Sequence, residues 1–258
     1  MVNGLREGNN TSEKVLDFIL ADIFLTAEYR VMRVFIDGLL SGPKRSDEVL
    51  KQCGSRIHDL GNDCVLILHR AVDECNVNIV AILSDSLEAA EHTDTWVQML
   101  LVKDDKGKTA WIMAIERGNI QLLEILWECA NEKLTAEEIN NKLLLATDVD
   151  RKTIFQMATN QGRLEILQKL WEWAKEKLTT EEINNKLLLA TDVDRRTVFH
   201  MAAYKDTLEI LQKLWEWANE KLSTEELNNK LLLATDNFGR TVFHIATYQG
   251  RLEILQKL

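Results

Sequence analysis

From residue 104 onward, the sequence repeats itself every 44 residues. Each repeat carries an aspartate, a threonine five residues later, an aromatic residue two after the threonine and an alanine three further on. The threonines are Thr109, Thr153, Thr197 and Thr241. Residues 164–191 recur as residues 208–235 with only three changes, so the period is not accidental. A repeat of this size cannot bury its own apolar side chains and becomes stable only when neighbouring repeats stack.

The period divides the chain into an N-terminal segment, residues 1–57, and a predicted stack, residues 58–258. A weaker copy upstream aligns residues 76–83 with residues 119–126 at an offset of 43. We therefore expect five repeats, at residues 58–103 (degenerate), 104–147, 148–191, 192–235 and 236–258 (incomplete).

Composition predicts an all-α fold. The chain has one proline and eleven glycines among 258 residues, so few residues interrupt helices. In residues 1–57, apolar residues follow helical spacing from Val15 to Phe24, and a second amphipathic run, residues 27–40, stops before Pro43. Two interpretations of this segment stay open. It forms either a helical cap over the apolar face of the first repeat or a separate interaction module for a partner protein.

Charge and cysteine content argue against several classes of function. A net charge of −10 disfavours nucleic acid, which proteins bind through clustered lysine and arginine. The apolar stretch from Val15 to Leu25 is too short to cross a membrane and contains Asp17 and Asp22. The four cysteines include no C-x-x-C pair of the kind found in zinc sites. We expect a protein that binds neither nucleic acid nor membrane and resides in the cytosol, with the nucleus as an alternative.

The last repeat resembles the ankyrin repeat. Its pattern, Asp-x-x-Gly-x-Thr-x-aromatic-His-x-Ala, is read from Asp236, Gly239, Thr241, Phe243, His244 and Ala246, and is followed by Gly250 and Leu252. The resemblance spans roughly residues 60–258. It implies a turn around residues 236–240, a helix A near residues 242–249 and an antiparallel helix B from about residue 251.

One departure from the family pattern concerns the turns. Arg151 and Arg195 replace the glycine of the turn, and Asp206 replaces a later glycine. Arginine lacks the freedom of Gly107 and Gly239 to adopt a positive φ. We therefore expect the turns at Arg151 and Arg195 to be tighter or differently shaped.

The other departure is length, because the period of the family is about 33 residues. The additional residues begin with a capping-box pattern, S/T-x-x-E, at Thr135, Thr179 and Ser223. This pattern predicts a third helix that places Ile139 and Leu143 on one face. The expected fold is an all-α, ankyrin-like helical solenoid with three helices per repeat and an N-terminal helical cap.

Tryptophans recur on the predicted helix B, at Trp127, Trp171, Trp173, Trp215 and Trp217. They could stack on a ligand, but aromatic residues that recur at the structural period more commonly form core. We favour the core interpretation.

The residues give no sign of catalysis. His200 and His244 stand in the histidine position of the family, where the resemblance implies a hydrogen bond to the turn backbone. Gln156 and Ile112 replace histidine in two other repeats, so a repeating metal site cannot form there. The sequence contains no phosphate-binding glycine loop, nucleophile elbow or H-E-x-x-H helix. We expect no enzymatic activity, no cofactor and no metal.

The resemblance implies that a partner binds across a concave side formed by the turn tips and helix A. The repeats of this chain differ most at the tips and at the ends of helix A, where packing does not dictate the residue, although unconstrained drift would give the same pattern. The candidate partner-binding residues are Lys106, Arg117, Asp150, Arg151, Lys152, Gln161, Asp194, Arg195, Arg196, Tyr204, Lys205, Phe238, Arg240 and Tyr248. Arginine and aromatic residues often anchor interfaces.

Three hypotheses of function follow. We favour a non-enzymatic scaffold that presents a surface, basic at its turn tips, to a segment of a partner protein, with an acidic segment as one candidate. The alternative is a structural protein that associates with itself, because the chain ends at Leu258 within the predicted helix B and leaves Leu252 and Leu255 uncovered. The third is an enzyme whose catalytic domain lies beyond residue 258.

Overall fold

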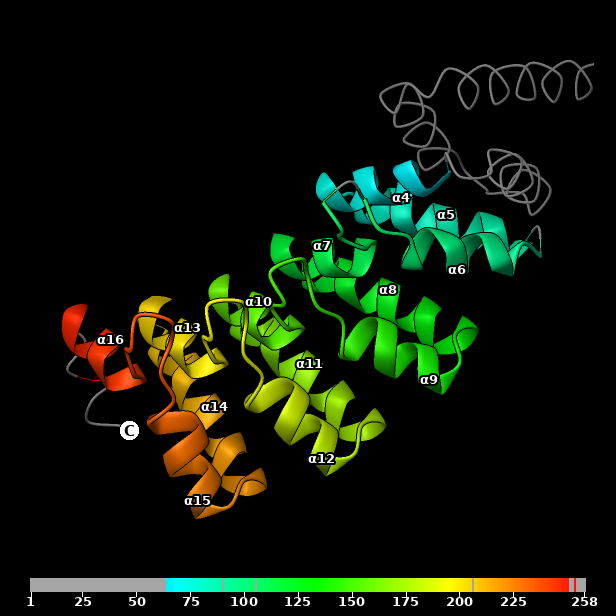
Figure 1. Ribbon diagram of the computed structural model, residues 1–258. Coiled ribbons are helices and arrows are strands. Elements are labelled where there is room, and N and C mark those ends of the chain that lie inside the picture. Colours follow the sequence, from blue (N-terminus) through cyan, green and yellow to red (C-terminus); the bar gives the residue numbers. More distant parts are fainter. Residues whose placement is uncertain (1–63, 90, 105, 206, 251–252, 254–258) are drawn as a thin grey trace, which may run out of the picture. The chain divides into compact units, whose positions relative to one another are not determined.

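The computed structural model describes residues 64–89, 91–104, 106–205, 207–250 and 253. Within these residues every named element is a helix (Figure 1), which confirms the all-α class for the described part of the chain. The chain divides into two compact units, an N-terminal unit of residues 1–102 and a C-terminal unit of residues 103–258. The cap or module predicted for residues 1–57 lies outside the described residues.

The described part of the N-terminal unit contains three helices, α4 (Cys64–Asp73), α5 (Val77–Ala89) and α6 (Thr93–Leu101). Helix α4 packs against both of the others. The buried side chains include Leu68, Val72, Ile79, Leu83, Leu87, Trp96, Met99 and Leu100. These residues belonged to the predicted degenerate repeat, and here they form a small apolar core.

In the C-terminal unit, a short first helix and a long second helix alternate with the period of the sequence. The first helices, named helix A, are α7 (Ala110–Arg117), α10 (Ile154–Asn160), α13 (Val198–Lys205) and α16 (Val242–Tyr248). The second helices, named helix B, are α8 (Ile120–Lys133), α11 (Leu164–Lys177) and α14 (Leu208–Lys221). The helix A expected near residues 242–249 is therefore present. The helix B expected from about residue 251 falls almost wholly outside the described residues.

The recurring threonine begins helix A. The Thr109 hydroxyl accepts a hydrogen bond from the Ile112 amide at 3.3 Å, and the Thr153 hydroxyl accepts one from the Gln156 amide at 3.3 Å. Such N-caps satisfy one of the amides that a helix start leaves without a partner. The threonine recurs every 44 residues because each helix A needs this cap.

A third helical segment follows each described helix B, as the capping boxes predicted. The segments are α9 (Ala136–Glu138) with η2 (Ile139–Leu144), α12 (Thr180–Ile183) with η3 (Asn184–Leu188), and α15 (Thr224–Glu226) with η4 (Leu227–Leu232). In the first, the Glu138 amide donates to the Thr135 hydroxyl and the Thr135 amide donates to the Glu138 carboxylate, both at 3.2 Å. The same reciprocal pair recurs at Thr179 and Ser223.

The third segments differ from the prediction in helix type, because each continues as a π-helix after about one α-helical turn. In a π-helix the hydrogen bonds join residues five apart, so residues four and five apart share a face. Ile139, Leu143 and Leu144 are accordingly all buried on one side. The wider turn lets one short segment bury three large side chains.

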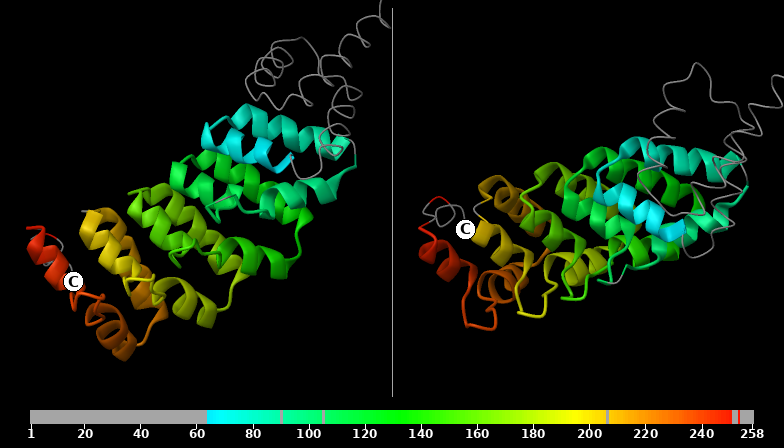
Figure 2. Two further views of the ribbon diagram at one scale, coloured as in Figure 1. Left: turned by 45° about the horizontal axis from the view of Figure 1, so that its top comes forward. Right: turned by 90° about the horizontal axis from the view of Figure 1, so that it is seen from above.

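Successive helices A lie side by side in the C-terminal unit, in the order α7, α10, α13, α16 (Figure 1; Figure 2). The helices B follow the same order, and each of η2 and η3 contacts the next helix B along the chain. The Asn140 side-chain amide donates to the carbonyl of Lys177 at 3.2 Å, and Asn184 does the same to Lys221 at 2.9 Å. Each asparagine thus satisfies a carbonyl at the C-terminal end of the next helix B.

The tryptophans stack on one another between neighbouring helices B. The rings of Trp127 and Trp173 lie 4.3 Å apart and 13° from parallel, and those of Trp171 and Trp217 lie 4.5 Å apart and 9° from parallel. All four side chains are buried, and Phe155 contacts both Trp171 and Trp217. These tryptophans belong to the core, as we favoured, and hold helices 44 residues apart in fixed register.

Replacing Trp217 with alanine is expected to lower the free energy of unfolding by about 3–5 kcal/mol, because a buried, stacked ring is lost. Trp215 is the matched control. It is half-buried and contacts Phe199 edge-on at 6.5 Å, so Trp215→Ala should cost less than half as much. Urea unfolding followed by circular dichroism measures both, and equal losses would contradict the assignment of the stacked pairs as core.

Candidate interaction surface

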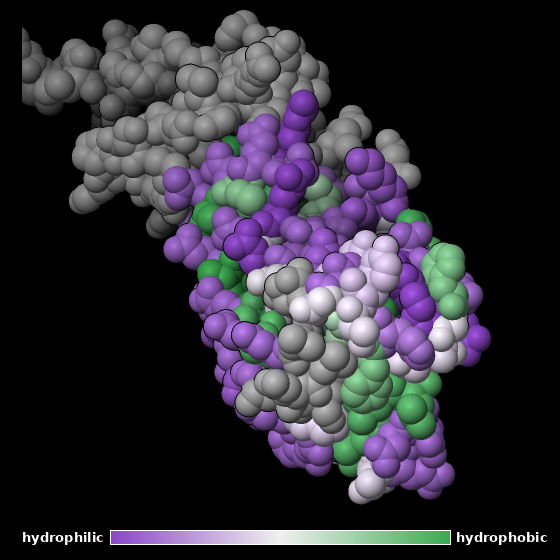
Figure 3. Space-filling view, turned by 90° about the vertical axis from the view of Figure 1, so that its left-hand side faces the viewer, coloured by the Kyte–Doolittle hydropathy of each residue, from purple (hydrophilic) through white to green (hydrophobic). Residues whose placement is uncertain are grey.

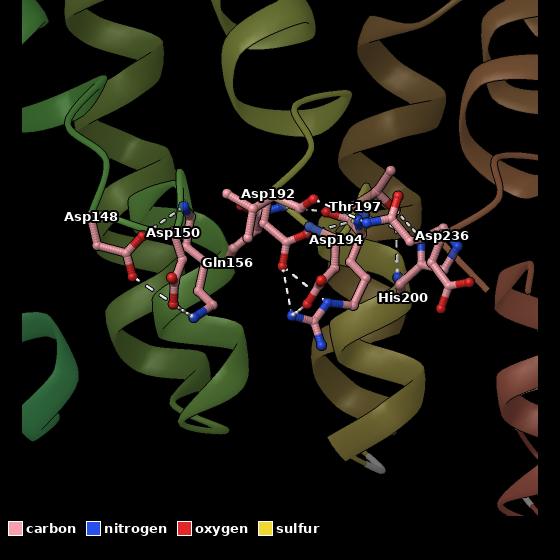
Figure 4. Close-up of polar contacts among 12 residues, drawn as sticks. Asp148, Asp150, Gln156, Asp192, Asp194, Thr197, His200 and Asp236 are labelled. Atoms are coloured by element: carbon pink, nitrogen blue, oxygen red, sulfur yellow. Dashed lines mark hydrogen bonds and ion pairs between the residues drawn. The ribbon is translucent and has the colours of Figure 1, made fainter. Parts of the chain in front are cut away.

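Every turn that precedes a helix A has the same backbone geometry. The aspartate amide donates to the carbonyl four residues later at 2.8–3.2 Å, and the residue at the fourth position donates back to the aspartate carbonyl at 2.9–3.1 Å. The aspartate side chain accepts from the amide of the fifth residue at 2.7–2.9 Å. The turns, named turn tips hereafter, are residues 104–108, 148–152, 192–196 and 236–240, although residue 105 is not described. Figure 4 shows this arrangement around Asp148, Asp192 and Asp236.

The turns at Arg151 and Arg195 are not differently shaped, contrary to our expectation. Arg151 has φ of 59° and Arg195 of 58°, close to the 74° of Gly107 and the 72° of Gly239. The left-handed conformation costs an L-residue about 1–2 kcal/mol. The hydrogen bonds of the aspartate and of the neighbouring tip hold both arginines in it.

Backbone hydrogen bonds join neighbouring turn tips into one row. The Val193 amide donates to the Asp150 carbonyl at 3.0 Å, and the Asn237 amide donates to the Asp194 carbonyl at 2.9 Å. The Asn237 side chain adds a bond to the Val193 carbonyl at 3.1 Å. The last three tips therefore form a continuous main-chain platform.

A buried side chain on helix A forms a hydrogen bond with the backbone of the next turn tip. The Gln156 side-chain amide donates to the Arg196 carbonyl at 2.7 Å, and the His200 Nε2 lies 3.1 Å from the Arg240 carbonyl (Figure 4). His200 Nδ1 accepts from the Thr197 amide at 3.2 Å, so Nε2 carries the proton and donates to Arg240. His200 thus has the turn-holding role that the family resemblance implied. Sequence reasoning missed that Gln156 performs it as well.

His244 differs from His200 in its surroundings. Its Nδ1 accepts from the Thr241 amide at 3.1 Å, but the ring is exposed. Burial is the main factor that lowers the pKa of His200, and it outweighs the hydrogen bond to the Arg240 carbonyl. The buried histidine is consequently neutral at physiological pH.

In the last three tips, the basic residue at the fifth position is paired within its own turn, whereas Lys108 of the first tip pairs with Glu116 on helix A at 2.6 Å. Lys152 bonds Asp150 at 2.8 Å, Arg196 bonds both Asp192 at 3.0 Å and Asp194 at 2.5 Å, and Arg240 bonds Asp236 at 2.7 Å. Burial raises the pKa of Asp236, but hydrogen bonds from Arg240 and from backbone amides outweigh it and leave the pKa lowered. Acidic and basic residues are equal in number within each tip. The tips are therefore not basic overall, contrary to our expectation.

The structure places all fourteen predicted partner-binding residues in the C-terminal unit, on turn tips or at the ends of helix A. Ten are exposed: Lys106, Arg117, Asp150, Arg151, Gln161, Arg195, Tyr204, Lys205, Phe238 and Tyr248. Four are partly exposed: Lys152, Asp194, Arg196 and Arg240. The Arg240 guanidinium lies 4.8 Å from the centre of the Phe238 ring, a cation–π distance.

Large hydrophobic side chains are also exposed on this surface. Phe238 is 75% exposed, Tyr248 86% and Tyr204 56%. Val149 (69%) and Val193 (47%) add to them, and sequence reasoning missed both because valine is usually a core residue. Their exposure could have been predicted from the sequence, since the same turn position holds the polar Asp105 and Asn237 in other repeats. From the α16 side of the C-terminal unit, hydrophobic patches interrupt a mostly hydrophilic surface (Figure 3).

The remaining features of the described residues bear on other classes of site. They contain no group of three histidine, cysteine or acidic side chains that could hold a metal ion. None of the helices placed by the structure combines the length and the apolar character needed to cross a membrane. Leu252, Leu255 and Leu258, which self-association would use, lie outside the described residues. Comparison of the sequence with models of protein families found no match, and comparison with curated proteins found none either.

Replacing Arg151 or Arg195 with glycine is expected to raise the free energy of unfolding by about 0.5–1 kcal/mol, because relief of the left-handed strain exceeds the added entropy of the unfolded chain. Arg151→Ala is the control, since it keeps the Cβ atom and should give no gain. Gly239→Arg should lose a similar amount, since no heavy atom lies within 4 Å of an added Cβ and only backbone strain acts. Chemical denaturation measures the free energy of unfolding of all four variants. If Gly239→Arg were as stable as the parent chain, arginine at this position would not be strained.

Acid is expected to weaken the fold through His200. The pKa of His200 in the folded chain lies below the unfolded value of about 6.5, so the stabilisation is complete above about 6.5 and is lost as the pH falls from there through the folded pKa. His200→Gln copies the bond of Gln156 without a titrating group. Unfolding at pH 7.5 and 5.5 should therefore show a larger loss for the parent chain than for His200→Gln. His244→Gln, at an exposed ring, should behave like the parent chain; equal losses in all three would exclude His200 as the cause.

Proposed function

We propose that this protein is a non-enzymatic scaffold with an ankyrin-like solenoid in residues 103–258, and that it binds a partner protein through its turn tips and the ends of helix A. The observation that carries the proposal is the exposure of Val149, Val193, Tyr204, Phe238 and Tyr248 on that surface. Clustered exposed apolar residues commonly mark interaction sites.

The order of elements supports the ankyrin-like architecture. A tight turn, a threonine-capped helix A and a longer helix B recur every 44 residues, and a third segment is added where the period exceeds that of the family. A histidine or glutamine on helix A bonds the next turn, as Gln156 and His200 do. These features are those expected of an ankyrin-like stack with an insertion in each repeat.

The separation of structural from free side chains supports a binding role. The aspartates that begin the turns, the threonine caps and the residues at Gln156 and His200 hold the backbone. The side chains at the tips and helix ends project from that fixed backbone into solvent. A rigid scaffold that carries variable exposed residues is how loops commonly supply binding surfaces. Exposed tyrosine and phenylalanine, as at Tyr204 and Phe238, are enriched in interfaces.

The shifted pKa values of the surface have structural causes. The pKa of Lys152 is raised although burial lowers it, because the hydrogen bond from Lys152 to Asp150 and the charge of Asp148 act in the other direction. The pKa of Asp236 is lowered by partners within its own turn. Such ion pairs need no catalytic role. The Cys75 thiol forms no disulfide, which is compatible with the reducing cytosol or nucleus that we propose for the protein.

Site-specific photocrosslinking in cells of the source organism tests the proposal. A photoreactive amino acid placed at Phe238 should yield adducts with defined proteins, and the untagged chain in excess should abolish them. The same amino acid at Lys186, which is exposed on η3, is the control and should give none. Adducts that are equally frequent at both positions, or absent at both, would refute this surface.

Alanine at Phe238, Tyr204 or Tyr248 should weaken binding of the captured partner by about tenfold for each residue that acts as an anchor. The free energy of unfolding should change by less than about 0.5 kcal/mol, since the side chains are exposed. Calorimetric titration and denaturation of the same samples separate the two effects. Unchanged affinity in all three variants would contradict the assigned surface.

A further inference from the structure

In two of the four turn tips, the fourth position holds arginine, although glycine would suit the backbone better. All the tips adopt a positive φ there, and the flanking hydrogen bonds are the same whether the residue is Gly107, Arg151, Arg195 or Gly239. A non-glycine residue in this conformation carries strain that persists only when the surroundings enforce it. Arg151 and Arg195 are therefore not explained by the turn that contains them.

Backbone hydrogen bonds hold both arginines in this conformation, but no contact of either arginine side chain with the described residues offsets the strain. Both side chains are exposed, and neither has a hydrogen-bond or ion-pair partner in the part of the chain that the structure describes. The basic residues at the next position contrast with them, since Lys152 and Arg196 are bonded to aspartates of their own tips. The fifth position is structural, whereas the fourth leaves its guanidinium unpaired.

Arg151 and Arg195 lie on adjacent turn tips that are joined by a backbone hydrogen bond. The Val193 amide bonds the Asp150 carbonyl, so the residue directly before Arg151 is tied to the residue two before Arg195. The nearby carboxylates of Asp150 and Asp194 are ion-paired with Lys152 and Arg196, which also pair with Asp148 and Asp192. The guanidinium groups are thus the unpaired charges of these two tips.

Each arginine has an exposed valine two residues before it, Val149 or Val193. The two tips therefore offer apolar surface and a cation side by side. A guanidinium presents a planar fork that binds a carboxylate through two parallel hydrogen bonds. The net charge of −10 opposes an acidic peptide only weakly, because charges beyond about 8 Å from it are screened at physiological salt.

We infer that Arg151 and Arg195 recognise carboxylate side chains of a peptide segment in which acidic and apolar residues are interspersed. The inference rests on the proposed function and specifies the chemistry of the partner. In this inference, the strained fourth position of the turn binds the ligand, and the ion-paired fifth position stabilises the turn.

Selection from a random library of twelve-residue displayed peptides tests the inference with the full chain as bait. The selected peptides are then synthesised, and their affinities are measured by fluorescence anisotropy. The test variant is Arg151→Gly with Arg195→Gly, which keeps the turn conformation and should fold at least as well as the parent. The control is Lys186→Gln with Lys230→Gln, which removes the same charge from exposed positions on η3 and η4.

Peptides selected by the parent chain should be acidic and should bind the double glycine variant at least about tenfold more weakly. They should bind the lysine control within about twofold of the parent chain, because an exposed lysine away from the ligand contributes little. Peptides without acidic residues, or acidic peptides bound equally by the glycine variant, would overturn the inference and leave the proposed function standing. Failure of the parent chain to enrich any peptide would overturn the proposed function itself.

Discussion

The C-terminal unit depends on contacts that each repeat makes with the one after it. Helix A supplies a buried donor to the next turn, at Gln156 and His200, and the π-helical segment supplies an asparagine to the end of the next helix B. Stacked tryptophans fill the space between the helices B. Since neighbouring repeats meet at a turn, at a helix end and in the core, they cannot slide or rotate independently.

Because the register is fixed, the backbone conformation of a turn tip does not depend on which residues occupy its exposed positions. The aspartate at the start of each tip determines the backbone path, and so arginine and glycine occupy the same left-handed position. In the last two tips, the bond from the preceding helix A adds to this constraint. A tip can then change its exposed side chains without changing shape. The same constraint that stabilises the stack leaves exposed side chains such as Val149, Arg151, Val193, Arg195 and Phe238 available to the proposed partner.

Sequence reasoning predicted the features that depend on local chemistry. The capping boxes at Thr135, Thr179 and Ser223 required a helix start, and the period required helices at equal intervals. The π-helical continuation could not be predicted, because it is selected by the fit of Ile139, Leu143 and Leu144 against neighbouring helices. The shape of the turn at Arg151 was mispredicted for a similar reason. Residue preference describes an isolated turn, whereas here contacts from outside the turn enforce a conformation that arginine disfavours.

The positions of the turn tips and of the helix A ends were predicted from the sequence, but the ion pairs within the tips were not. Lysine and arginine in the tips suggested a basic surface, and only the ion pairs show that position five is occupied by intramolecular bonds. What remains for a partner is a combination of exposed apolar side chains with two guanidinium groups. Because the tips share one backbone conformation, the proposed binding surface would distinguish between partners only through the side chains that differ between tips. Val149 and Arg151 in one tip, against Phe238 and Gly239 in another, would bind different parts of one extended ligand.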